Sequence, residues 1–140
     1  MAPLGEDEYR CPHTARGHRS RWALPERRVG AATAALRHHG RTPVVHVAGE
    51  VDLVSAPVLR GALDLALEHR PPVLVLDLRE VRLLAVAGLA ALTGACLRAG
   101  ELTRLRVVAT HHAVLRPLRV TALDRLVEVR PCLGEALAPF

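Results

Sequence analysis

The fold of this chain is decided by residues 73–78, which read Val-Leu-Val-Leu-Asp-Leu. A nearly continuous apolar run of this length is typical of a strand that is buried on both faces, as in the parallel sheets of α/β proteins. Pro71 and Pro72 stand directly before the run and end the element that precedes it. The stretch therefore predicts a central parallel strand, and the rest of the chain can be placed around it.

Helical patterns lie on both sides of this strand. On the N-terminal side, Ser55 can cap a helix that has Pro57 in its first turn and ends near Arg70. On the C-terminal side, residues 86–99 follow a helical period and Gly100 ends the helix. Strands that are joined by helices in this order imply right-handed crossovers and a parallel sheet.

The remaining segments complete an alternating pattern. The predicted strands cover residues 29–37, 43–48, 73–78, 105–109 and 125–129, and the predicted helices cover residues 55–70, 86–99, 115–120 and 132–138. The third helix is expected to begin only near Leu115, because Pro117 lacks an N–H and its ring would clash with an earlier turn. The predicted fold is α/β, a mostly parallel five-stranded sheet with an antiparallel edge strand and about four helices.

The length of 140 residues suits one domain with a working hydrophobic core. Residues 1–28 mix prolines and glycines with charges and follow neither a strand nor a helix period, so they are expected to form a disordered leader that folding does not need. The domain is expected to cover residues 29–140. Gly49 is expected to allow a tight exit from the second strand.

Composition excludes several classes of function. Aromatic residues make up only 2% of the chain, so platforms for stacking single-stranded nucleic acid have almost no material. The net charge of +5 comes from dispersed arginines without a dense basic block, which argues against direct contact with nucleic acid.

The expected location is the cytoplasm. The N-terminus lacks the apolar run of about 7 to 15 residues of a secretory signal. No stretch reaches the roughly 18 apolar residues of a membrane span, so no membrane insertion is expected. The cysteines, Cys11, Cys96 and Cys132, are odd in number and far apart, which argues against a disulfide framework and makes a reducing cytosol the simplest compartment.

Neither a metal site nor an enzyme is indicated. The eight histidines include two adjacent pairs, His38-His39 and His111-His112, and none has a standard zinc spacing. No phosphate-binding glycine loop is present, and the only serines, Ser20 and Ser55, are not in a nucleophile-elbow pattern. We therefore expect no cofactor and no catalytic activity.

Two segments resemble the signature segments of the STAS family, which includes the bacterial anti-sigma factor antagonists. They are residues 49–53, Gly-Glu-Val-Asp-Leu, and residues 73–89, which end in Leu-Leu-Ala-Val-Ala-Gly-Leu. The resemblance continues to the tail at residues 121–126, Thr-Ala-Leu-Asp-Arg-Leu. In phosphorylatable members the second segment ends in Asp-Ser-Ser-Gly-Leu, and a protein kinase modifies the second Ser. Here Ala87 stands at that position and cannot accept a phosphate.

The resemblance implies a partner and a site. In the family, the loop at this position and the helix that follows dock onto an anti-sigma factor, a kinase of the GHKL ATP-binding type, and an acidic residue in the first segment contributes to recognition. The residues of this chain that match are Asp52, Ala85, Val86, Ala87, Gly88, Leu89 and Leu92. The implied function is an anti-sigma factor antagonist that releases a sigma factor, affects transcription and lacks the usual serine switch.

Other interpretations stay open from the sequence alone. The loop at residues 84–87 can have lost its docking role and serve only for packing. Asp52 or Ser55 can serve only as a helix cap. Asp77 is better explained as a structural acceptor in a turn than as a catalytic group. The whole chain can also be a non-phosphorylated STAS scaffold or accessory subunit of a stress-signalling or transport complex. A small-molecule or nucleotide sensor is the third alternative, and it needs a polar pocket near Gly49 and Gly88.

Overall fold

The computed structural model describes residues 27–138, in which a six-stranded sheet carries helices on both faces. The strands are β1 (Arg27–Val29), β2 (Ala32–His39), β3 (Thr42–Val51), β4 (Val73–Leu84), β5 (Arg104–Val108) and β6 (Glu128–Arg130). The helices are α1 (Ala56–Leu67), α2 (Val86–Ala99), α3 (His112–Val120) and α4 (Leu133–Leu137), and a short 3₁₀ helix covers Leu123–Arg125.

The strands follow one another across the sheet in chain order, and the pairing changes from antiparallel to parallel at β3. β1, β2 and β3 form two tight hairpins, whereas β3, β4, β5 and β6 are parallel neighbours. The α/β class and the mostly parallel sheet are therefore confirmed. The sheet has six strands instead of the five predicted, because the three-residue β1 adds a second antiparallel pair. β1 also includes Arg27 and Arg28, which the sequence analysis assigned to the leader; residues 1–26 lie outside the described part.

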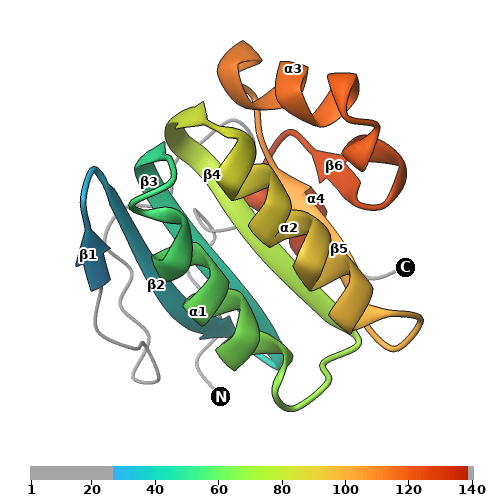
Figure 1. The fold of residues 1–140 in the computed structure, drawn as a ribbon. Helices are drawn as coiled ribbons and strands as arrows, with labels where there is room; N and C mark the ends of the chain where they lie inside the picture. Colours follow the sequence, from blue (N-terminus) through green and yellow to red (C-terminus); the bar gives the residue numbers. More distant parts are fainter. Residues whose placement is uncertain (1–26, 139–140) are drawn as a thin grey trace.

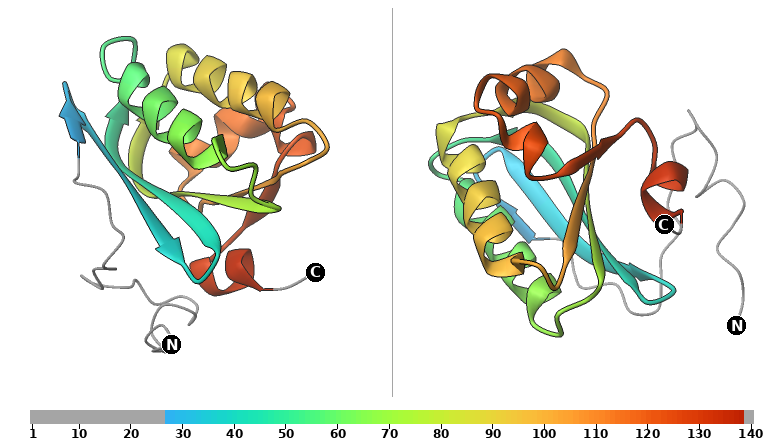
Figure 2. Two further views of the ribbon diagram at one scale, coloured as in Figure 1. Left: turned by 90° about the horizontal axis from the view of Figure 1, so that it is seen from below. Right: turned by 90° about the vertical axis from the view of Figure 1, so that its right-hand side faces the viewer.

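Two cores cover the two faces of the sheet. α1 and α2 lie side by side across one face, with α3 beyond α2, and their buried side chains join those of the sheet in the main hydrophobic cluster (Figure 1). α4 lies on the opposite face, over Val44, Val75 and Val108 (Figure 2, right). Small residues allow α2 to approach the sheet closely, since Ala91, Ala95 and Ala99 are all buried there.

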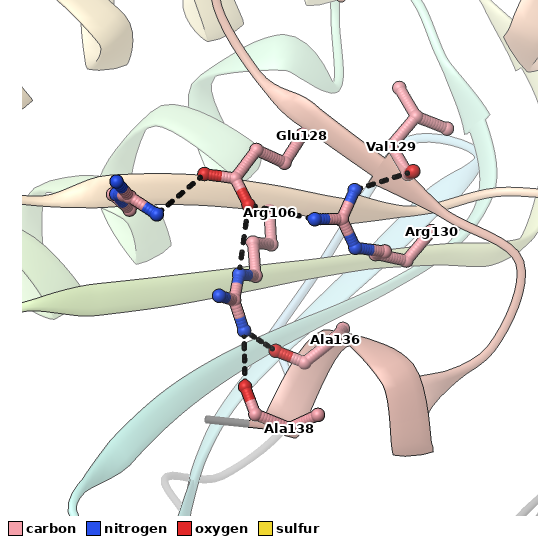
Figure 3. Close-up of polar contacts among 7 residues, drawn as sticks. Arg106, Glu128, Val129, Arg130, Ala136 and Ala138 are labelled. Carbon is pink, nitrogen blue, oxygen red and sulfur yellow. Dashed lines mark hydrogen bonds and ion pairs between the residues drawn. The ribbon is translucent and has the colours of Figure 1, made fainter. Parts of the chain in front are cut away.

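Arg106 fixes α4 to the sheet (Figure 3). This arginine of β5 is buried, and its Nη1 donates to the carbonyl oxygens of Ala136 at 2.9 Å and Ala138 at 2.7 Å. Its Nε lies 3.2 Å from Glu128 Oε1, and the same carboxylate also pairs with Arg130 and Arg104. The last carbonyl groups of a helix lack partners within the helix, so Arg106 supplies the donors they need.

β4 continues well beyond its predicted end. The prediction stopped early because two bulges interrupt the alternation of buried and exposed residues along the strand. Its register against β3 slips between His46 and Ala48 and again between Gly49 and Glu50, and each slip adds one residue to β4. The residues that face the main core are consequently Leu78, Val81 and Leu84, three apart instead of two. A spacing of three does not indicate a strand, which is why the sequence predicted an end at Leu78.

Two other predictions are corrected by the structure. Gly49 lies inside β3, which continues to Val51. It has a φ of 96°, and a Cβ there would overlap the carbonyl oxygen of Ala31. α3 begins at His112 despite Pro117. The ring removes the N–H that would pair with the carbonyl of Ala113, and Ala113 is exposed, so water can satisfy that carbonyl.

The cysteines and the helices bear on the expected location. Cys96 is a free thiol, Cys132 is disulfide-bonded, and Cys11 lies outside the described residues. The prediction concerned a disulfide framework, which one bonded cysteine among the described residues does not form, and the expected compartment stays a prediction. Among the described helices, none combines the length and the apolar character that crossing a bilayer requires.

Candidate docking site

The two signature segments meet where β3 and β4 end and α2 begins. Val51, the last residue of β3, is paired with Leu84, the last residue of β4. The backbone N–H of Ala85 then donates to the carbonyl oxygen of Val51 at 2.9 Å. Residues 49–53 and 85–89 therefore lie side by side at the carboxyl ends of parallel strands, where α/β proteins commonly bind their ligands and partners.

Gly88 allows this close approach. It is buried in the first turn of α2, and a Cβ placed on it would lie 2.7 Å from Val51 Cγ1 and 2.7 Å from Leu84 Cδ1. Real Cβ atoms do not come so near to other carbon atoms, so a side chain here would push the helix away from the strand ends. The glycine is thus a packing requirement that joins the two segments.

The start of α2 carries no polar side chain. Ala85 stands at the N-cap with extended backbone angles, φ −82° and ψ 176°, and no side-chain hydrogen bond caps the helix. The first turn also lacks an acidic residue. Ala87 is half-buried and packs against the main core. Ala87, like its neighbours Ala85 and Val86, carries no hydroxyl group.

Asp52 is held rigidly by the turn that leads into α1. Its Oδ1 accepts from the backbone N–H groups of Val54 and Ser55, both at 3.0 Å. The hydroxyl oxygen of Ser55 lies 2.9 Å from the same Oδ1 and 2.8 Å from the carbonyl oxygen of Glu50, so its one proton is shared between these acceptors. These bonds hold the turn before α1, whereas α1 itself has Ser55 at its N-cap and no side-chain hydrogen bond caps it, so the simple capping role that the sequence left open for Asp52 or Ser55 is not observed.

The turn also keeps Asp52 ionised. The hydrogen bonds from the backbone N–H and then the hydroxyl of Ser55 lower the pKa of Asp52 below its usual value, against a smaller opposing effect of burial. Only Oδ1 takes part in the hydrogen bonds of this turn. The carboxylate consequently has a fixed orientation.

Three exposed apolar side chains surround these residues. Leu53 is 81% exposed, Val54 is 65% exposed and Val86 is 80% exposed. We call these three residues, together with the partly exposed Ala87, the apolar rim. The family resemblance predicted contacts at Val86 and Ala87, but none at Leu53 or Val54. Their sequence position gave one indication of exposure, because they form an apolar pair in a loop between a strand and a helix cap.

The other residues that the family resemblance assigned to the contact site are buried. Leu92 is fully buried in the main core, and Leu89 is 9% exposed. Gly88 is buried as well. A partner that docks on this structure cannot contact the Leu92 side chain, so we place Leu89 and Leu92 with the packing that supports the helix and not with the contact surface.

Asp77 has a structural setting on the other face of the sheet. Its carboxylate accepts from the backbone N–H and side chain of Arg79 and lies 2.9 Å from His46 Nδ1. Burial alone would raise the pKa of Asp77, but the hydrogen bonds from His46 and Arg79 and the charge of Arg79 hold it well below its usual range. These bonds fix the first bulge of β4.

Two hollows in the described surface lie away from this site. One, of about 370 Å³, is lined mainly by α3 and β6, and another, of about 520 Å³, lies at the C-terminal ends of α1 and α2. Neither hollow is lined by Gly49 or Gly88. Within residues 27–138, no three His, Cys, Asp or Glu side chains are grouped closely enough to hold a metal ion.

Comparison with known proteins identifies the family. Residues 34–128 match the family model described as "Mlab, STAS domain". Anti-sigma-F factor antagonist RsfB of Mycobacterium tuberculosis is 30% identical over 105 residues, which cover 75% of this chain and 86% of that protein. The crystal structure of an anti-sigma factor antagonist from Mycobacterium paratuberculosis is 36% identical and superposes with a TM-score of 0.73, covering 76% of this chain and 92% of that one.

A more distant structure shares the fold alone. A Thermotoga maritima protein of known crystal structure is 19% identical and has a TM-score of 0.58. The family model spans more than half of this chain, from within β2 to the start of β6. The chain belongs to the STAS domain family and is homologous to bacterial anti-sigma factor antagonists.

Proposed function

We propose that this protein is an anti-sigma factor antagonist that acts by binding alone. In this proposal Asp52 and the apolar rim dock on an anti-sigma factor of the GHKL kinase type. The anti-sigma factor then releases its sigma factor, and transcription changes without contact between the antagonist and DNA. The homology to RsfB supports the antagonist role, and the protein itself performs no catalysis. A cytoplasmic location follows from this role.

The observation that carries the proposal is the exposure of the apolar rim around Ala87. Solvated loops normally carry polar residues, and contiguous exposed apolar side chains mark interaction sites. Burying one such side chain contributes about 1.5 to 3 kcal/mol, so Leu53, Val54 and Val86 can together support a specific complex. Asp52 adds a fixed, ionised carboxylate that a cationic side chain of the partner can approach.

The proposal also explains what the loss of serine does. A phosphate on this position would add roughly −1.5 to −2 charges to a surface that loses water on binding. The N-terminus of α2 would tolerate that charge. In a relative that is phosphorylated at this position, the phosphate would therefore weaken docking without disrupting the fold. Ala87 removes this control, and the docking surface remains permanently in its unmodified state.

The test compares two substitutions of Ala87 in titration calorimetry. The partner is first captured from lysate of the source organism with the wild-type chain, identified, and purified. Ala87→Asp places an unpaired charge inside the contact while the helix start accepts an acid, so the free energy of binding should weaken by about 2 kcal/mol or more. Ala87→Ser adds a small hydroxyl that can bond the first turn, and it should bind like the wild type.

Thermal unfolding of the same two variants is the control. Both melting temperatures should stay near the wild-type value, so that a loss of binding can be assigned to the surface. Equal affinity for the wild type and Ala87→Asp would show that this loop is not the docking site. A scaffold role within a larger STAS assembly would then be the better explanation.

A further inference from the structure

One face of the sheet carries much less helix than the other. α1, α2 and α3 fill one face, whereas within residues 27–138 only the five-residue α4 lies on the opposite face, over Val44, Val75 and Val108 (Figure 2, right). We call this opposite side of the sheet the α4 face. The described helices therefore leave most of the α4 face to be covered by another segment or by water.

Two side chains of β2 are nevertheless buried on the α4 face. Arg37 pairs with Val44, so Ala35 and His39, two residues to either side of Arg37, point to the same face as Val44. Ala35 is 7% exposed and His39 is 6% exposed. α4 packs on β4, β5 and β6, and Ala35 belongs to neither of the two hydrophobic cores. Their burial indicates that a further segment lies over this part of the face.

The bond of Cys132 points to the segment in question. Cys132 is buried at the start of α4, on the α4 face, and is disulfide-bonded. Cys96 is a free thiol on α2, and the chain has only three cysteines. Within one chain, the bonding partner left for Cys132 is Cys11, which belongs to residues 1–26.

The chain is long enough for such a bond. Arg27 belongs to β1 at one edge of the sheet, and Cys132 follows β6 at the other edge. Six strands at roughly 4.8 Å spacing make a sheet about 24 Å wide. The 16 residues from Cys11 to Arg27 can span about 50 Å when extended. Since the other face is filled by helices, a chain that joins these two edges has to run over the α4 face, where Ala35 and His39 lie.

A cluster of positive charge lies close to Cys132. The carboxylate of Glu128 interacts with Arg104 at 3.6 Å, with Arg106 at 3.2 Å and with Arg130 at 2.9 Å (Figure 3). Three guanidinium groups and one carboxylate give these four residues a net charge of +2. Arg130 is only two residues before Cys132 in the sequence. We call these four residues the arginine cluster.

The residues before Cys11 have the complementary charge. Residues 6–8 read Glu-Asp-Glu, and residues 1–9 contain no Arg, Lys or His. A bond between Cys11 and Cys132 would hold these acids within about 10 to 17 Å of Cys132 along the chain. They could then reach the arginine cluster, where carboxylates can pair with guanidinium groups.

We propose that residues 1–26 form a strap across the α4 face, which is tied by a disulfide between Cys11 and Cys132 and by pairing of residues 6–8 with the arginine cluster. The strap takes the place of the dispensable leader that the sequence predicted. It goes beyond the docking function and does not depend on it, because the strap lies on the face opposite α2.

The chemistry of the tie is thiol–disulfide exchange with a small disulfide such as oxidised glutathione. The S–S bond of glutathione breaks and the S–S bond between Cys11 and Cys132 forms. The two protein thiols give two electrons and two protons to the glutathione, which leaves as two thiols. The strap is therefore tied under oxidising conditions and released by an excess of thiol, so the α4 face responds to the redox state.

The first experiment locates the bond. The full chain is equilibrated with mostly oxidised glutathione, quenched with acid and digested without reductant. Mass spectrometry should find a peptide pair that joins Cys11 to Cys132. A bond between two chains would appear instead as a dimer that reductant separates, and it would contradict the strap.

The second experiment measures whether the bonded segment lies on the sheet. Trypsin cleaves after Arg16, Arg19 and Arg21, and a docked segment resists cleavage until it opens. Cleavage of the native protein at these sites should be at least about tenfold slower when it is oxidised than when it is reduced. Cys11→Ser should be cleaved rapidly under both conditions. Cys96→Ser is the matched control and should behave like the wild type.

The third experiment tests the charges. Glu6→Gln, Asp7→Asn and Glu8→Gln are combined in a Cys96→Ser background, and the equilibrium constant for disulfide formation with glutathione is measured. It should fall about fivefold, as expected for the loss of three surface ion pairs. The matched control removes the same three charges from exposed sites outside the α4 face and should leave the constant unchanged; it combines Glu68→Gln, Glu101→Gln and Asp124→Asn.

Three results would overturn the proposal. They are the absence of a peptide pair joining Cys11 to Cys132, equal cleavage of the oxidised and reduced protein, and an unchanged exchange constant after removal of the three acids. None of them involves the anti-sigma factor, so the docking function is decided separately by the calorimetric test.

Discussion

The missing side chain of Gly88 leaves room for Val51, because a Cβ at position 88 would lie only 2.7 Å from Val51 Cγ1. Val51 is itself fully buried and branched at Cβ, so it cannot rotate away at low cost. The start of α2 and the end of β3 are therefore matched surfaces. Through this one contact, the two segments that bear the family resemblance become a single site.

Gly88→Ala should destabilise the protein. The added methyl group overpacks a filled space, and we expect a loss of about 1–3 kcal/mol in the free energy of unfolding. Gly61→Ala is the matched control, since Gly61 is also in a helix but a Cβ there meets nothing within 4 Å. It should stabilise the protein by about 0.5–1 kcal/mol. Urea denaturation measures both, and effects of the same sign would contradict the packing argument.

Ala85→Asp should stabilise α2. The backbone at position 85 already has the extended angles of an N-cap, and a carboxylate there can accept from the free N–H groups of the first turn. The gain should be about 1 kcal/mol in the free energy of unfolding. Ala90→Asp puts the same group in the exposed middle of the helix, where it has no cap to form, and should be neutral or destabilising. Equal effects of the two changes would rule out capping.

Asp77→Asn should change how stability depends on pH. The folded-state pKa of Asp77 is lowered, so its contribution is fully present above the unfolded-state pKa and is lost as the pH falls. The wild type should lose stability between about pH 5 and pH 2 more steeply than Asp77→Asn does.

At neutral pH, Asp77→Asn should be less stable by about 3 kcal/mol, because Arg79 loses a buried partner. The exposed Asp124→Asn is the comparison, and it should stay within about 0.5 kcal/mol of the wild type. Parallel pH profiles for Asp77→Asn and the wild type would refute this account of the buried carboxylate.

Arg106→Met should loosen α4. The carbonyl oxygens of Ala136 and Ala138 lose their donor, while Glu128 keeps Arg130 and Arg104. We expect a loss of about 2–4 kcal/mol in the free energy of unfolding. Hydrogen exchange should accelerate first at the amides of α4. Arg106→Lys keeps the charge but not the planar fork of donors, so its loss should be intermediate. Uniform exchange across the sheet would indicate that Arg106 does not hold α4 in particular.

Incubation with ATP and the kinase that proves to be the partner should leave no phosphate on residues 85–89, which mass spectrometry can verify. These residues carry no hydroxyl group. Ala87→Ser, treated in the same way, shows whether the kinase still recognises the loop. Stoichiometric phosphate on Thr93 that alters partner affinity would refute the idea of an unswitched antagonist.

Patterns in the sequence predicted the regular elements well where one period held. α2 was predicted at residues 86–99 and is observed there, because its apolar period is uninterrupted and Gly100 ends it. The second half of β4 was missed because its bulges change the spacing of the buried residues. β1 was missed because three residues are too few to show a period.

The site was predictable only in part. The family resemblance located the loop at residues 85–89, but a motif says nothing about which side of the helix faces water. Leu92 was taken for a contact residue and is in the core. Contacts at Leu53 and Val54 were not predicted, because the exposure of these side chains depends on the conformation of the turn that Asp52 holds. Sequence periods describe single elements, whereas a surface is formed by several elements together.

The two bulges of β4 have a consequence for how this site can evolve. Beyond Asp77, β4 is paired with β3 but no longer with β5, so the proposed docking site stands at the end of a two-stranded extension. Its position depends on the residue count between Asp77 and Leu84 and on the bonds that hold Asp77. The tip residues can therefore change in chemistry, even from serine to alanine, while the extension continues to present them at the same place. Inserting or deleting one residue of β4 far from the tip would have the opposite effect. The tip would keep the same residues, but their side chains would turn to the wrong face of the sheet.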